Sequence, residues 1–200
     1  MELAGSDGAS SILSTLSRAA GGNALLALLD TRDATAVRAT CREARDEVAA
    51  FPWDDVSTRD PKTGQWVGGT RITGSLASWR ACFPHALGAD VRGRGGLVDA
   101  DFVHLRGLKR VNMSDCGGVT DGAFALLRGI HTLDLGGCDQ AGITDGAFAH
   151  LRGIHTLDTS GCTQAGITDG AFAHLRGIHT LDVDGCDAGV QAAAARVVMG

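Results

Sequence analysis

The sequence has no tyrosine, few other aromatic residues and no long apolar run. Three Trp and six Phe among 200 residues are too few for a platform that stacks single-stranded nucleic acid. The formal net charge of -5 excludes the generally basic surface that is typical of nucleic-acid-binding domains. No stretch approaches the ~18 consecutive apolar residues of a membrane-spanning helix. We therefore expect no nucleic-acid partner and no membrane partner.

The amino terminus lacks the features of a secretory signal. The stretch from Met1 to Leu16 carries acidic residues, has no basic start and contains only a short apolar segment. A signal peptide needs a basic region followed by an apolar one. We therefore expect the six cysteines to be free thiols in a reducing compartment, and we predict an intracellular location, cytoplasmic or nuclear.

The most prominent feature of the sequence is repetition from residue 86 onward. Cysteines recur in it every 22 to 24 residues, at Cys116, Cys138, Cys162 and Cys186. The block 130-153 differs from the block 154-177 at only three positions. A first, degraded copy precedes them, in which Arg94 takes the place of the cysteine. The predicted units are 86-107, 108-129, 130-153, 154-177 and 178-200, within one array over 86-200.

Each unit combines a strand pattern with a helix pattern. In the first half apolar and polar residues alternate, as at Leu133 and Leu135, which is typical of a strand. In the second half the apolar residues between Ile143 and Leu151 have helical spacing. Thr144 or Asp145 can cap this helix by accepting a bond from a free amide. The glycine that closes each unit permits the positive φ of a helix end.

This repeat resembles the leucine-rich repeat, in its cysteine-containing subtype, over roughly Ala86 to Gly189. The resemblance implies an α/β solenoid with a short parallel sheet on its concave face and helical turns on its convex side. It also implies that the four repeat cysteines point inward as structural residues. The ending "VQAAAARVVMG" is predicted to be a helical cap, because terminal repeats must be covered.

On such a sheet the residues that alternate with buried ones would face a partner. The predicted partner-binding residues of the concave face are Arg110, Asn112, Thr132, Asp134, Thr156, Asp158, Thr180, Asp182 and Asp184. Strands lie about 5 Å apart, so Asp134, Asp158 and Asp182 would form an acidic ladder. We interpret the ladder as a docking surface for a basic or polar segment of an unknown protein target. The alternative is that duplication copied one solvated Asp that binds nothing.

The repeated histidines and cysteines raise metal-binding and catalytic alternatives, which their spacing disfavours. His131, His155 and His179 each stand seven residues before a cysteine, whereas zinc ligands pair at closer spacing. A flat row of carboxylates does not wrap around calcium, and no single activated thiol stands apart as a nucleophile. We expect no metal, no cofactor and no catalytic residue, and hence no enzyme. A further column is interpreted as structural: Arg106, Arg128, Arg152 and Arg176.

Residues 54-85 form a bridge between the repeats and the N-terminal segment. Asp60 and Pro61 mark a turn between short β-prone pieces, which predicts a hairpin. The stretch from Gly74 to Phe83 has the pattern of a helix. The tryptophans are expected to pack the bridge onto the first repeat rather than to form a binding patch; they are Trp53, Trp66 and Trp79.

The N-terminal segment, 8-53, is predicted to be helical. Asp33 is the expected N-cap of a helix that runs to about Ala50 and ends before Pro52. The spacing of five residues resembles that of an F-box: Leu29, Asp33, Val37, Cys41 and Arg45. The Leu-Pro start of that family is absent.

An F-box followed by cysteine-type leucine-rich repeats resembles the substrate-recognition subunits of Skp–cullin–F-box ubiquitin ligases. The resemblance implies binding of a Skp-type linker subunit by Leu25, Leu26, Leu29, Val37 and Cys41. The alternative is that these helices only cap the solenoid, which needs a cap in any case. The chain would then be a leucine-rich-repeat binding scaffold with no ubiquitin role.

Overall fold

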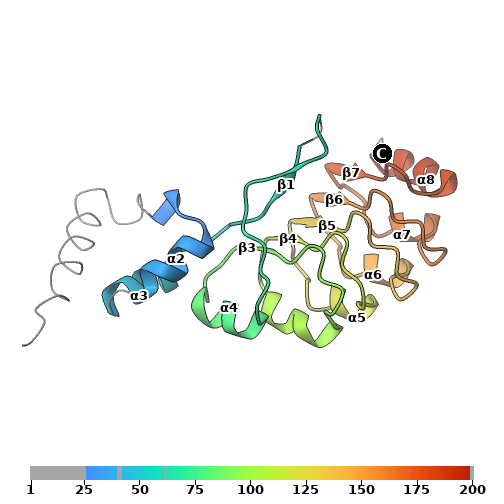
Figure 1. The fold of residues 1–200 in the computed structure, drawn as a ribbon. Coiled ribbons are helices and arrows are strands. Elements are labelled where there is room, and N and C mark those ends of the chain that lie inside the picture. The colour runs from blue at the N-terminus through green and yellow to red at the C-terminus, as the bar shows by residue number, and fades with distance from the viewer. Residues whose placement is uncertain (1–25, 40–41, 61, 199–200) are drawn as a thin grey trace, which may run out of the picture.

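The computed structural model describes residues 26-39, 42-60 and 62-198 and has a mixed α/β fold around a five-stranded parallel sheet. The strands follow one another across the sheet in chain order. They are β3 (Gly88–Asp90), β4 (Arg110–Asn112), β5 (Thr132–Asp134), β6 (Thr156–Asp158) and β7 (Thr180–Asp182). Figure 1 shows the helices of the repeats together on one side of this sheet. We call the face turned away from them the open face; it corresponds to the predicted concave face.

Each strand leads through a turn to a short helix on the other side of the sheet. The helices are η2 (Asp99–Leu105), a 3-10 helix, then α5 (Asp121–Phe124), α6 (Asp145–Phe148) and α7 (Asp169–Phe172). Of the two possible caps of α6, Thr144 is the one used, because its side chain accepts a bond from the amide of Gly146. Gly153 then turns the chain with a φ of 79°, a conformation that a Cβ atom disfavours.

The aspartate beside each capping threonine joins neighbouring units instead of capping its own helix. Asp121 Oδ1 accepts from the backbone N–H of Thr144 at 2.8 Å, and Oδ2 accepts from the Thr144 hydroxyl at 2.6 Å. The same two bonds join Asp99 to Thr120 and Asp145 to Thr168. Each aspartate thus satisfies an amide that begins the next unit's helix, which links the helices along the array.

The core runs continuously through the stacked units. One fully buried phenylalanine comes from each of four successive units: Phe102, Phe124, Phe148 and Phe172. Each such side chain contributes about 1.5–3 kcal/mol by leaving water. Since a unit has neighbours only before and after it in the row, this burial depends on stacking, as in repeat proteins generally.

The repeat cysteines lie inside this core, and their thiols donate to backbone carbonyls of the preceding unit. Cys138 Sγ lies 3.2 Å from the carbonyl oxygen of Met113. The equivalent bonds run from Cys116 to Val91, from Cys162 to Leu135 and from Cys186 to Thr159. Burial raises the pKa of all four thiols. They therefore remain protonated donors, which is a structural state and not that of a nucleophile.

Within the described residues, three short helices precede the bridge: η1 (Leu26–Leu28), α2 (Thr31–Arg38) and α3 (Arg42–Ala50). The N-cap of α2 is Asp30, whose side chain accepts from the amide of Asp33 at 2.8 Å. The prediction of one helix capped by Asp33 and running to Ala50 is therefore wrong. Asp30 has an extended backbone and sits three residues earlier, which is the geometry an N-cap requires.

The bridge contains the predicted hairpin and helix. The elements are β1 (Thr58–Arg59), β2 (Trp66–Val67), which pair antiparallel, and α4 (Leu76–Cys82), which Ser75 caps. Trp53 and Trp79 are buried, and Trp53 Nε1 donates to the carbonyl of Val48 at 2.7 Å. Trp66 is instead half-exposed on the hairpin. Trp66 still packs on the first repeat, as expected, because the guanidinium of Arg92 lies 5.0 Å from the centroid of its ring.

The array ends in the predicted helix, α8 (Ala188–Val198). Its buried residues include Val190, Ala193 and Ala194, which join the hydrophobic core at the end of the array. Within the residues that the structure describes, no helix is both long enough and apolar enough to cross a membrane.

Candidate functional site

The register of the sheet lines up the open-face residues in rows that cross the strands. The middle row consists of Asp90, Asn112, Asp134, Asp158 and Asp182, which pair strand to strand. The first row consists of Gly88, Arg110, Thr132, Thr156 and Thr180. Parallel strands are about 4.8 Å apart, so members of one row are close neighbours. Repetition of the unit thus places like groups side by side.

The hairpin β1–β2 covers the beginning of the middle row. Asp90 is completely buried, and its Oδ2 accepts from Ser57 Oγ at 2.5 Å and from Arg92 Nη1 at 2.6 Å. Asn112 Nδ2 donates to the carbonyl of Ser57 at 3.4 Å. The Arg92 guanidinium also lies over the Trp66 ring, 5.0 Å from its centroid, a cation–π contact. These bonds hold the hairpin across β3 and β4.

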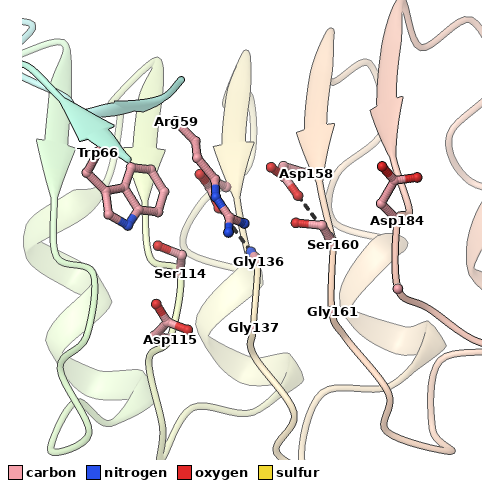
Figure 2. A pocket seen from close by; sticks show the side chains of 12 residues that line it. Arg59, Trp66, Ser114, Asp115, Gly136, Gly137, Asp158, Ser160, Gly161 and Asp184 are labelled. Carbon is pink, nitrogen blue, oxygen red and sulfur yellow. Dashed lines mark hydrogen bonds between the residues drawn. The ribbon is translucent and has the colours of Figure 1, made fainter. Parts of the chain in front are cut away.

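Beyond the hairpin, the open face is hollowed into a cavity of about 450 Å³. Figure 2 shows Arg59 reaching over the sheet from the hairpin, with Trp66 beside it. The carboxylates in its lining are Asp115, Asp134, Asp158 and Asp184. Its glycines are Gly136, Gly137, Gly161 and Gly185. Because these glycines carry no side chain, they leave the space that the carboxylates surround.

The carboxylates of the middle row are only partly satisfied by the protein. Asp134 Oδ1 accepts from the amide of Gly136 at 2.9 Å, and Asp158 Oδ1 accepts from that of Ser160 at 2.8 Å. Within the described residues, the second oxygen of each has no hydrogen-bond partner, and neither carboxylate forms an ion pair. The cavity is therefore complementary to a ligand that brings N–H donors and positive charge.

Burial in the sheet changes the pKa of the Asp134 carboxyl group. Burial raises its pKa from 3.8 to about 7, with the Gly136 amide and Arg59 opposing the rise and Asp158 adding to it. Desolvation disfavours the charged form because the protein replaces water around it. The charge of the cavity thus changes near neutral pH, and a cationic ligand would favour the ionised form.

Two predicted contact residues of the concave face are engaged within the protein. Asn112 is 0% exposed, so its prediction as a partner-binding residue is wrong. The hairpin covers it, and the hairpin was expected only to bridge two segments. Arg110 Nη1 forms an ion pair with Asp54 Oδ2 at 2.9 Å, so its charge is already compensated.

The other predicted residues lie on the open face. Thr132, Thr156 and Thr180 each place Oγ1 about 3.1–3.2 Å from Nδ1 of the preceding histidine. Asp182 and Asp184 are exposed on the last strand and in the turn after it. Asp184 also lines the cavity, together with Asp134 and Asp158.

The residues of the cavity that sequence reasoning missed include three with large or charged side chains: Arg59, Trp66 and Asp115. A signal for Asp115 was present, since aligned units have Gly137, Gly161 and Gly185 at its position. Its φ of 53° is left-handed, which Asp tolerates better than most residues. Arg59 and Trp66 gave no such signal, because their place depends on where the hairpin folds.

The structure describes three of the five residues predicted to bind a linker subunit. Leu26 is buried, and Leu29 and Val37 are half-buried against the core. Leu25 and Cys41 lie outside the described residues. Leu28, between two of the predicted positions, is 81% exposed.

No group of three or more His, Cys, Asp or Glu side chains in the described part of the chain is arranged to hold a metal ion. No family model matches the chain, and a comparison with curated proteins finds no relative.

Proposed function

We propose that this chain is a protein-interaction module, a leucine-rich-repeat solenoid that binds a target on the open face. The observation that carries the proposal is the cavity of about 450 Å³ lined by carboxylates with no ion-pair partner among the described residues. Catalysis would require unlike groups converging on one point. The rows instead place like groups next to one another from strand to strand, which suits an extended polar contact with a partner protein.

The leucine-rich-repeat assignment is supported by three features of the array. The parallel strands follow in chain order. Each of the strands β4 to β7 ends near an inward cysteine whose thiol donates to the preceding unit, as Cys138 does to Met113. A one-turn helix then returns the chain, and α8 closes the row. All three agree with the resemblance of the 22- and 24-residue units.

The proposed target chemistry is a basic segment that inserts a Lys or Arg side chain between the hairpin and β5–β6. Asp134 and Asp158 would accept from its cation, and the Trp66 ring offers an aromatic face beside them (Figure 2). An exposed charge pair contributes about 0.2–1 kcal/mol, and a desolvated pair contributes more. Arg59 of the hairpin also lines the cavity and acts on Asp134, so the ligand's cation would share the carboxylates with it.

A decalysine peptide tests this site directly. The variant Asp134→Asn/Asp158→Asn should bind it about tenfold more weakly than the unmodified protein, a loss of about 1.4 kcal/mol. The matched control is Asp33→Asn/Asp46→Asn, which removes the same charge from exposed positions of α2 and α3. Equal loss in both variants would reduce the effect to net charge and contradict the site.

For the N-terminal helices we propose binding of a Skp-type linker subunit, which makes the chain a substrate receptor of a ubiquitin ligase. The F-box-like spacing supports this role, as do the short helices η1, α2 and α3 and the exposed side chain of Leu28. The cap alternative is favoured by Leu26, which is buried, and by Leu29 and Val37, which pack against the core.

A pull-down with a purified Skp-type linker subunit separates these two roles. The unmodified chain should bind it, and Leu28→Asp should abolish binding while leaving the fold intact by circular dichroism. Val98→Asp is the matched control, because Val98 is 53% exposed on the repeat array. Failure of the folded, unmodified chain to bind would leave the helices as a cap and the protein as a scaffold without a ubiquitin role.

A further inference from the structure

Charges within the repeat units are segregated along the strand direction. In the units that follow the degraded first one, the stretch from the end of the helix to the start of the next strand contains Arg and His and no acidic residue. An example is the stretch from Ala147 to Leu157. Between the strand and its helix, as from Asp158 to Asp169, the charged residues are acidic. Although the chain as a whole has a net charge of -5, one side of the array is therefore basic.

The basic residues collect at the edge of the sheet where the strands begin. One column directly precedes β4 to β7 and consists of Lys109, His131, His155 and His179. A second column stands three residues earlier in each unit and consists of Arg106, Arg128, Arg152 and Arg176. All eight side chains belong to exposed residues. We call these two columns the basic edge.

Contacts between units show that the edge is continuous. The imidazole rings of His131 and His155 stack with centroids 4.5 Å apart, and those of His155 and His179 do the same. Arg128 and Arg152 both line one hollow of about 450 Å³, and Arg128 Nη2 lies 3.2 Å from His150 Nδ1 in it. Cationic and imidazole groups are thus neighbours of one another along the row.

The cations of the basic edge have no counter-charge in the described part of the chain. The two ion pairs found there are Arg92–Asp90 and Arg110–Asp54. Lys109 Nζ contacts the backbone carbonyl of Gly129 at 3.4 Å. Since no carboxylate of the described residues pairs with these cations, an external anion could do so.

We propose that the basic edge binds an acidic segment of a partner protein, laid in extended form across the repeats. The segment must be narrow, because the acidic middle row stands three residues further along each strand, about 10 Å away. That distance is near the screening length in physiological salt. A nucleic-acid duplex would span both rows and be repelled by Asp134, Asp158 and Asp182, whereas a single peptide strand fits the cationic row alone. This surface is separate from the open-face cavity, so the inference goes beyond the proposed function.

The stacked histidines make this binding pH-dependent. Each imidazole faces the next one, Lys109 precedes β4 at the position equivalent to His131, and an arginine stands three residues before each ring. The Nδ1 atoms face threonine hydroxyls, and the nearby carboxylate of Asp54 is held by Arg110. Desolvation and the two neighbouring imidazoles lower the pKa of His155. An acidic segment would favour the protonated form of His155, so its affinity rises as the pH falls through the lowered pKa of that ring.

The test is fluorescence anisotropy of a labelled decaaspartate peptide with the full chain at low salt. The variant Arg128→Gln/Arg152→Gln/Arg176→Gln should weaken binding about tenfold, from the sum of three exposed charge pairs. His131→Gln/His155→Gln/His179→Gln should remove the gain in affinity between about pH 7.5 and pH 5.5. The matched control for lost charge is Arg32→Gln/Arg42→Gln/Arg45→Gln, at exposed positions of α2 and α3.

Three results would overturn the proposal. The first is that the unmodified chain does not bind the peptide, and the second is that the folded arginine variant binds it as well as the unmodified chain does. The third is that a DNA duplex binds as tightly as the peptide, which would make the partner a nucleic acid. Decalysine binding by the arginine variant should remain intact, so failure here is distinguishable from failure of the open-face site.

Discussion

Replacing Asp134 by Asn should stabilise the protein at alkaline pH and leave it nearly unchanged in acid. Asn has the same shape and keeps an oxygen to accept from the Gly136 amide, which lies 2.9 Å from Asp134 Oδ1. It removes only the charge, which burial disfavours and which the neighbouring Asp158 repels. The variant therefore isolates the cost of holding this carboxylate ionised on the open face.

The magnitude follows from linkage between protonation and folding. The pKa of Asp134 is raised from 3.8 to about 7 in the folded state. A carboxyl group with a raised folded pKa stabilises the protein fully below its unfolded pKa and loses that contribution as the pH rises through the folded value. One pKa unit is about 1.36 kcal/mol. Between about pH 5 and pH 8 the gain from Asn should grow by about 2 kcal/mol, after allowance for the part of the group that water reaches.

Urea unfolding followed by circular dichroism across this pH range measures the gain. The matched control is Asp182→Asn, because Asp182 occupies the same row and bonds the amide two residues on in the same way, but is exposed. A difference between the Asp134→Asn variant and the unmodified protein that is equal at both ends of the pH range would refute the reasoning. So would an equal pH-dependent gain in the control.

Two further changes test how the units are joined. Asp121→Ala should cost about 1–2 kcal/mol of unfolding free energy, because it removes both bonds to Thr144 and leaves a helix amide unpaired. Asp169→Ala, the equivalent change in the last unit with this motif, should cost almost nothing, since no bond from Asp169 to a following threonine exists among the described residues; equal losses in urea unfolding would contradict the linkage. Gly129→Ala should cost about 1 kcal/mol through its φ of 79° alone. Gly118→Ala should cost at least twice as much, because its φ is similar and a Cβ would lie 2.6 Å from the carbonyl oxygen of Leu97; thermal unfolding that ranks the two in the opposite order would count against this account.

The local structure of the repeats was readable from the sequence because it depends on short-range chemistry. Alternation around Leu133 predicted β5, and the residues after Ile143 predicted α6, as found. Thr144 marked the start of that helix, but the helix ends at Phe148, earlier than the predicted end at Gly153, which instead makes the turn into the next unit. Each of these signals acts within a few residues, so the surrounding fold had little opportunity to override them.

The errors arose where a distant segment decided the outcome. Asn112 looked like a surface residue from its own strand, and the hairpin buries it. Trp66 packs on Arg92 of the first repeat as expected, but the fold of the hairpin also places it at the cavity, which was not expected. The prediction of Asp33 as a helix N-cap was wrong for a local reason. Asp30, three residues earlier, is the N-cap because it has the extended backbone that this position needs.

The sequence by itself determined that the chain repeats, that each repeat is a strand and a helical turn, and that like residues line up in rows. A fixed repeat length makes that alignment unavoidable once the strands are parallel. Only the tertiary structure decided where the hairpin crosses the rows. The position of the hairpin in turn determines the cavity and the burial of Asn112, and the packing of the sheet raises the pKa of Asp134. The anchor of the hairpin is a contact between Ser57 and Asp90, which are 33 residues apart in the chain, and neither residue's own neighbours specify it.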